Sequence, residues 1–157
     1  MSIAPKLQQF LDEAKADYEL VEHEPTKSSL ESAKSCAVPA DRLAKSILLD
    51  TDDGPLLAVL PSDRKVELSE LRSELGHKPR LVGERELNSV FSDCDVGAVP
   101  PVGYGVTTII DDSLGKQPDV YFEAGDHKSL VHMDRAEFSR VTEGARHGQF
   151  SEPSLVD

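Results

Sequence analysis

Apolar residues recur along this chain with two different spacings, and each spacing predicts a type of element. A helical stripe near the N-terminus consists of Ile3, Leu7, Phe10, Leu11 and Ala14. Further on, two apolar runs are separated by TDDG, in which Asp53-Gly54 is a strong signal for a tight turn. Residues 44–50 and 55–61 are therefore predicted to form a β-hairpin.

Shorter patterns predict the remaining elements. Helices are expected at 28–38, where Ser28 and Glu31 form a capping box, and at 68–76, 84–91 and 134–141. Strands are expected at 18–23, 106–111, 119–125 and 128–133. Antiparallel hairpins with peripheral helices indicate an α+β domain over 1–143, and the polar tail 144–157 is expected to be loose.

Composition narrows the class of protein. The chain has 157 residues, 38% of them hydrophobic, and no apolar run long enough to cross a membrane. We expect no signal peptide and no membrane partner. Two isolated cysteines favour neither a disulfide scaffold nor a zinc site, so a cytoplasmic location is expected. A net charge of −12 argues against broad coating of nucleic acid, and we do not expect DNA as a partner.

Lys45 raises the sharpest question in the sequence. On a strand it shares one face with Leu43, Ile47 and Leu49, while Ala44, Ser46 and Leu48 share the other. An ammonium among apolar neighbours is costly unless it is paired or faces a cavity. Two interpretations stay open: a functional lysine, or a side chain that reaches to the edge of the sheet.

The sequence GAVPPVGYG, residues 97–105, fits neither a helix nor a strand. Its three glycines and two prolines fix an irregular backbone. Such a loop can aim the amides of Ala98 and Val99 at a developing negative charge. The loop can also be a tight structural connection between a helix and a strand, and the pattern alone favours that interpretation.

The other polar candidates carry weaker signals. His127 sits in a predicted Gly-Asp turn, where it either contacts a ligand or only fills the turn, and Thr26 is either a helix cap or a pocket hydroxyl. No third ligand joins His127 and His132, so we expect no metal and no other cofactor. Nucleophile and nucleotide-binding motifs are absent.

Several motifs in order resemble the YbaK/EbsC family, the free-standing relatives of the editing domain of bacterial prolyl-tRNA synthetases. They are HEPT, LAKSILL, LAVLPSDRKVEL, DCDVGAVPPVG, IIDDSL and VYFEAGDHKSLVHM, spread over roughly residues 3–142. The resemblance implies a mixed, mostly antiparallel sheet that curls towards a barrel and is surrounded by helices. It also implies hydrolysis of the ester that joins a wrong amino acid to tRNA.

The resemblance also assigns roles to residues. The family's key lysine matches Lys45, its Gly-x-x-x-Pro loop matches Gly97, Ala98, Val99, Pro100 and Pro101, and its turn histidine matches His127. Thr26 and Ser46 are expected to line the same pocket. The alanine-clearing branch often carries Asn where this chain has Ser46, so the amino acid stays open.

Together these features predict a trans-editing aminoacyl-tRNA deacylase that acts on small amino acids. Its substrate is the aminoacyl-tRNA 3′ end, with an aminoacyl-tRNA synthetase as a further candidate partner. The alternative is a non-catalytic module that holds an aminoacyl or nucleotide end or docks on a synthetase. Because aminoacyl esters are already labile, the site needs only to position water and stabilise the oxyanion.

Overall fold

The β2–β3 hairpin forms the middle of the sheet. The computed structural model describes residues 3–23, 38–95 and 98–154, and in it β2 spans Leu43–Thr51 and β3 spans Gly54–Pro61. The two strands pair antiparallel along their length, ending with Thr51 opposite Gly54. Gly54 has φ of +106°, a left-handed conformation that glycine adopts without strain. This confirms the hairpin predicted from Asp53-Gly54.

The main sheet has the strand order β1-β8-β7-β2-β3-β6-β9, with β5 also paired to β2, while β4 and β10 form a separate pair. Three pairings are parallel, β2 with β7, β3 with β6 and β6 with β9, and the others are antiparallel. The remaining strands are β1 (Glu19–Glu22), β4 (Arg64–Val66), β5 (Arg80–Leu81), β6 (Thr107–Asp111), β7 (Asp119–Glu123), β8 (Ser129–Asp134), β9 (Arg146–Gly148) and β10 (Ser151–Pro153).

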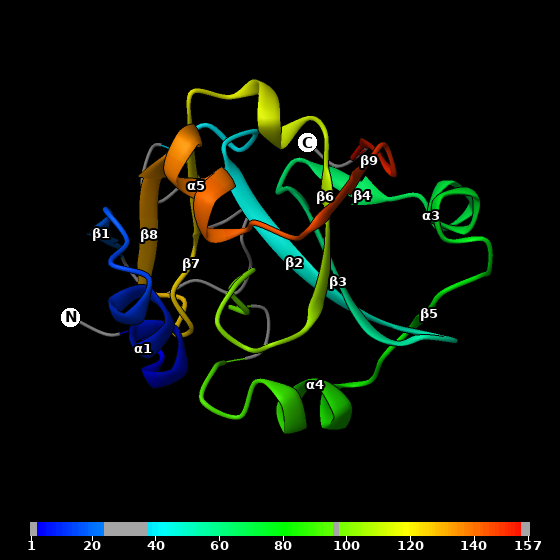
Figure 1. Cartoon of the computed structure of the whole chain (residues 1–157), viewed down its shortest axis with the longest axis horizontal. Helices are drawn as coiled ribbons and strands as arrows, with labels where there is room; N and C mark the ends of the chain where they lie inside the picture. The colour runs from blue at the N-terminus through cyan, green and yellow to red at the C-terminus, as the bar shows by residue number, and fades with distance from the viewer. Residues whose placement is uncertain (1–2, 24–37, 96–97, 155–157) are drawn as a thin grey trace.

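The helices lie around this sheet (Figure 1). In the described residues they are α1 (Pro5–Glu13), α3 (Leu68–Leu75), α4 (Glu84–Val90), α5 (Arg135–Val141) and the short 3₁₀ helix η1 (Leu114–Lys116). Their ends follow the sequence: Gly76 ends α3 in the left-handed conformation, and the Asp134 side chain caps α5 by accepting from the Glu137 amide. The α+β class with a mixed, mostly antiparallel sheet is thus confirmed.

The two faces of β2 contribute to different parts of the core. Ala44 and Leu48 belong to a large cluster that also contains Leu7 of α1 and Phe138 of α5. Leu49, on the opposite face, belongs to a second cluster with Leu71 of α3 and Phe150. Strand alternation therefore puts α1 and α5 over one side of the sheet and α3 over the other.

The C-terminal segment corrects the expectation of a loose tail. Within the described residues, β9 pairs parallel with β6 and β10 pairs antiparallel with β4. Between them Phe150 is fully buried and its amide donates to Asp111 at 3.0 Å. The polar composition of this segment gave no sign of its order, because a single aromatic residue, Phe150, holds it to the core. The helix expected at 28–38 lies almost entirely outside the described residues.

Candidate functional site

Lys45 lies where two central strands separate. The parallel ladder between β2 and β7 is only two residues long, joining Leu43 to Tyr121 and Ala44 to Phe122. Beyond it Lys45 continues along β2 and Glu123 continues along β7. We call this place the β2–β7 fork. At this place the ladder between β2 and β7 has ended, and the sequence alone does not reveal this setting of Lys45.

The ammonium of Lys45 is held in a partly dehydrated position. The side chain is half-buried, and burial lowers its pKa from the ordinary value, while the charge of Asp63 acts in the opposite direction. Among the described residues, no hydrogen-bond or ion-pair partner contacts this ammonium. An unpaired, partly buried cation favours an anionic or strongly polarised ligand.

Ser46 points to the other face of the strand. Its Oγ is buried and has no hydrogen-bond partner in the part of the chain that the structure describes. A buried hydroxyl without a partner costs free energy unless water or a ligand satisfies it. Lys45 and Ser46 therefore present polar atoms on both sides of the fork.

The predicted loop packs on the same side of the sheet as Ser46. Ala98, Val99, Pro100 and Pro101 are all buried, and Val99 joins the core cluster that contains Ala44. The amide of Ala98 donates to the Asp95 carbonyl at 3.0 Å, so it is already used and is not an oxyanion donor in this conformation. Of the two amides proposed from the sequence, only that of Val99 lacks an acceptor among the described residues.

The two prolines also line a cavity of about 300 Å³, together with residues from α1, β3, 102–108 and 141–145. Leu57, one of its lining residues, pairs with Leu48 and so lies on the face of the sheet opposite Lys45. Lys45 does not line this cavity. This cavity is therefore not the pocket expected to join Lys45 to the loop, and a pocket shared by the two stays a prediction.

His127 occupies the turn between β7 and β8, close to the end of the fork. It is 7% exposed and has φ of +58°, an uncommon conformation for a residue other than glycine. The preceding Asp126 supports the turn, because its Oδ1 accepts from the amides of Lys128 at 2.9 Å and Ser129 at 3.1 Å. His127 is thus a buried, conformationally fixed side chain and not an exposed filler of the turn.

The residues just before the loop contact the turn that carries His127. The Asp95 amide donates to the Gly125 carbonyl at 2.7 Å, and a Cβ on Gly125 would approach the Cys94 Sγ to 3.5 Å. The structure therefore brings the chain that enters the predicted loop against the turn that carries His127. The position of this pair relative to the Lys45 ammonium stays a prediction, because Gly97 lies outside the described residues, as does Thr26.

Sequence reasoning missed Glu123. Its side chain is 1% exposed, and alternation from Tyr121 puts it on the face of β7 that matches the Lys45 face of β2. The only signal for it was a glutamate at the end of an otherwise apolar strand. Glu123 thus gives the fork a second polar side chain besides Lys45, and this one is buried.

In residues 3–23, 38–95 and 98–154, no group of three His, Cys, Asp or Glu side chains is arranged to hold a metal ion. None of the described helices is long and apolar enough to cross a membrane.

Comparison with known proteins connects this geometry to one family. Residues 23–141 match the model of the aminoacyl-tRNA editing domain. The prolyl-tRNA editing protein ProX of Acetoanaerobium sticklandii is 24% identical over 139 residues, which cover 83% of this chain and 85% of that protein. The range 23–141 that matches the editing-domain model includes Lys45, the loop and the His127 turn.

Two solved structures share the fold. A candidate trans-editing enzyme for prolyl tRNA synthetase superposes with a TM-score of 0.85 at 22% identity, covering 96% of this chain and 99% of the other. A scaffold protein used for computational grafting of epitopes superposes with a TM-score of 0.84 at 20% identity, covering 96% and 97%. At these identities the likeness establishes the fold alone.

Proposed function

Since the chain belongs to the aminoacyl-tRNA editing domain family, we propose that it is a trans-editing deacylase that hydrolyses the ester of a small amino acid mischarged on tRNA. The observation that carries the proposal is Lys45, a half-buried ammonium with no ion-pair partner among the described residues. The substrate has the matching chemistry, because the aminoacyl-tRNA 3′ end offers a terminal phosphate and a polarised ester carbonyl.

In the proposed reaction, water attacks the ester carbonyl and the bond to the ribose oxygen breaks. The free amino acid leaves, and the ribose oxygen recovers a proton. Lys45 holds the negative charge of the phosphate or of the developing oxyanion.

No side chain serves as a covalent nucleophile in this scheme. The one described cysteine, Cys94, has its thiol pKa raised to about 12 by burial, so it stays protonated at neutral pH. Water is instead oriented by the ribose hydroxyl next to the ester and by backbone groups. This suffices because the ester is labile, and positioning contributes much of the rate.

The experiment is deacylation of a panel of tRNAs charged with small and large amino acids. The names of two relatives, a prolyl-tRNA editing protein and a candidate trans-editing enzyme for prolyl tRNA synthetase, make proline tRNA carrying alanine the first substrate to test. We expect turnover of alanine, serine, cysteine or proline and none of phenylalanine. A substrate without the neighbouring ribose hydroxyl should react far more slowly.

If no mischarged tRNA is hydrolysed, the proposal fails. Tight binding of the same tRNAs without turnover would favour a non-catalytic module that holds the aminoacyl end.

A further inference from the structure

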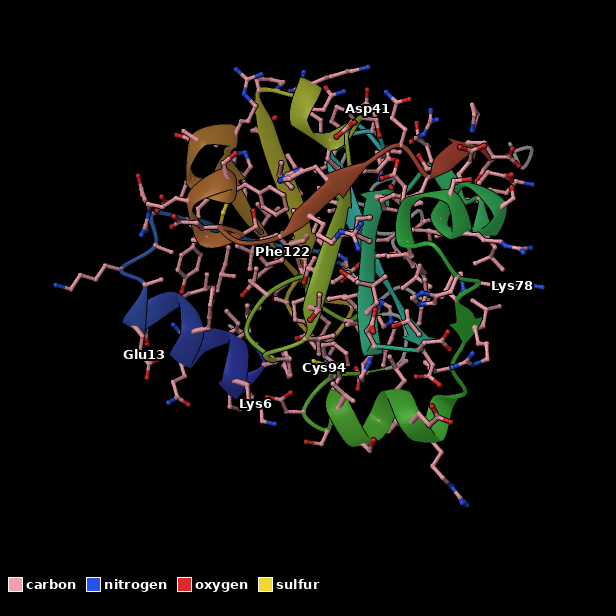
Figure 2. The ribbon with its side chains drawn as sticks, turned by 45° about the vertical axis from the view of Figure 1, so that its right-hand side comes forward. Lys6, Glu13, Asp41, Lys78, Cys94 and Phe122 are labelled. Atoms are coloured by element: carbon pink, nitrogen blue, oxygen red, sulfur yellow. The ribbon has the colours of Figure 1, made fainter. Side chains whose placement is uncertain are left out.

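A polar cluster lies beside the predicted loop, formed by Asp93, Cys94 and Tyr104. The Tyr104 hydroxyl donates to Asp93 Oδ1 at 2.5 Å, and the Cys94 Sγ lies 3.1 Å from the same hydroxyl oxygen. Asp93 Oδ2 accepts from the backbone amide of Lys6 at 3.0 Å. Figure 2 shows Cys94 near the end of α1 that carries Lys6. We call these three residues the Asp93 cluster.

The Asp93 cluster joins the two ends of the segment that carries Ala98–Pro101. Asp93 precedes that stretch and Tyr104 follows it, so their hydrogen bond closes the segment at its base. The Tyr104 ring also packs on Phe91, with the ring centroids 4.5 Å apart. The buried loop between them is therefore fixed at both ends by one carboxylate.

Cys94 of the Asp93 cluster, together with the neighbouring residues Ala4 and Asp95, lies against the turn that carries His127. The Ala4 amide donates to the Ala124 carbonyl at 2.8 Å, and the Asp95 amide donates to the Gly125 carbonyl at 2.7 Å. A Cβ on Gly125 would lie 2.8 Å from the Ala4 Cβ and 3.5 Å from the Cys94 Sγ. There is no space here for a side chain, so the turn is held against α1 and Cys94.

The protonation states of the cluster do not change near neutral pH. Burial opposes ionisation of Asp93, but the hydrogen bonds from Tyr104, Lys6 and Cys94 together hold the pKa of this carboxyl below its usual value. Burial raises the pKa of the Tyr104 phenol, as it raises that of the Cys94 thiol. An ionised acceptor with protonated donors is a permanent brace and not a pH switch.

We propose that the Asp93 cluster is a positioning element that sets the separation between the Ala98–Pro101 loop and the His127 turn, and thereby the size of amino acid that the site accepts. The proposal rests on the function proposed above, because it names the residues that define the specificity of that site. Asp93 and Tyr104 act through the loop and the turn. They are positioning residues, since neither has been placed in contact with the reacting atoms.

The test is Tyr104→Phe, which removes one hydroxyl and keeps the ring on Phe91. Loss of a hydrogen bond to a charged group, with misplacement of the loop, should lower kcat/KM on alanyl-tRNA by about tenfold or more. The decisive readout is the ratio of kcat/KM for leucyl-tRNA to that for alanyl-tRNA, which we expect to rise by about tenfold as size exclusion relaxes.

Tyr18→Phe is the matched control. The Tyr18 hydroxyl accepts a hydrogen bond from the side chain of Gln8 on α1 at 3.0 Å, a contact that involves neither the Asp93 cluster nor the His127 turn. Its loss should leave the leucine-to-alanine ratio unchanged. If Tyr104→Phe also leaves that ratio unchanged, the cluster is only structural and the proposal is wrong. Asp93→Asn, which keeps the shape but removes the charge, should give a smaller change in the same direction if Tyr104→Phe fails to fold.

A binding measurement separates this proposal from the proposed function. Adenosine carrying alanine or leucine through a non-hydrolysable amide probes the same site without turnover. If the wild-type protein binds the alanyl analogue but hydrolyses no ester, the deacylase proposal fails, and the affinity ratio in Tyr104→Phe still decides the role of the cluster. A wild-type protein that binds both analogues equally contradicts the positioning proposal.

Discussion

Lys45 shows, at the scale of a residue, how burial changes the chemistry of a common side chain. Its ammonium is half-buried at the β2–β7 fork, and the loss of hydration lowers its pKa. The effect is moderated by the charge of Asp63. The residue is thus held at a cost to the fold, which is typical of positions kept for binding or catalysis.

This cost predicts how stability depends on pH. A lowered pKa means that the folded protein binds fewer protons than the unfolded chain as the pH approaches the ordinary lysine value of 10.5. The free energy of unfolding of the wild type should therefore rise relative to Lys45→Met as the pH increases through the folded pKa. Urea denaturation across alkaline pH measures it.

Lys65→Met is the control for that measurement. The Lys65 ammonium lies 2.9 Å from the Glu152 carboxylate, and this hydrogen bond raises its pKa. Lys65→Met should show no such gain of the wild type over the variant. A pH dependence of Lys45→Met equal to that of the wild type would contradict a dehydrated Lys45.

His127 leads to a prediction about specificity. Its buried side chain forms a wall of the proposed pocket, so His127→Ala should change which amino acids are accepted more than it lowers the best rate. Rates on alanyl-, seryl- and leucyl-tRNA measure the change. His127→Gly is the companion variant, because glycine adopts the positive φ without strain and this variant should be about 0.4–1 kcal/mol more stable than His127→Ala. If both variants fold but are inactive on every substrate, while a substrate without the ribose hydroxyl reacts normally with the wild type, His127 is the general base.

At the scale of elements, the C-terminal strands complete the fold. β9 extends the sheet beside β6, and Phe150 fills the space between Asp111 and the α3 side of the core. Replacement of a fully buried phenylalanine by alanine costs about 3–5 kcal/mol. Phe150→Ala should lower the free energy of unfolding by that amount in urea denaturation.

The exposed neighbour Gln149 provides the control for Phe150. Gln149→Ala should change stability by less than about 0.5 kcal/mol. A Phe150→Ala variant as stable as Gln149→Ala would show that the C-terminal segment does not contribute to the core.

His132 ties three strands together through charge. Its Nδ1 lies 2.6 Å from the Glu19 carboxylate of β1, and its Nε2 lies 2.8 Å from the Asp119 carboxylate of β7. Burial disfavours the imidazolium, but hydrogen bonds to both carboxylates outweigh it and raise the pKa of His132 above 6.5. The stabilisation is fully present below 6.5 and is lost as the pH rises through the folded pKa.

His132→Gln should remove that pH dependence. We expect about 1 kcal/mol of stability to disappear from the wild type across this window, a modest value because the Glu19 side chain is exposed. Equilibrium unfolding on both sides of the folded pKa measures it. An equal pH slope in wild type and variant would show that His132 is not protonated in this contact.

At the scale of the whole molecule, the sequence predicted elements better than it predicted the arrangement of the site. Periodicity found every described helix of two or more turns and the two central hairpins, because those elements bury regular apolar faces. It missed β4, β5, β9 and β10, since each is only two or three residues long and mostly polar. The family resemblance supplied the mixed sheet, which no local pattern encodes.

The candidate site shows what local sequence patterns cannot predict, namely features that depend on contacts between distant segments. Lys45 stood out as a charge on an apolar strand, but the fork that exposes it arises from a two-residue pairing between distant segments. The use of the Ala98 amide by Asp95 and the burial of Glu123 likewise depend on tertiary contacts. The sequence therefore identified the polar residues of the site, but it could not show which of their atoms are free to bind a substrate.

The most direct test of the proposed role of Lys45 in ester hydrolysis is single-turnover deacylation of alanine-charged proline tRNA by Lys45→Met. Methionine keeps the apolar stem and removes the ammonium, so folding should persist, as thermal unfolding would verify. We expect the rate to fall about a hundredfold or more, the scale expected when a donor to a developing oxyanion is lost. A folded Lys45→Met protein that hydrolyses this ester at the wild-type rate would contradict a catalytic role of Lys45.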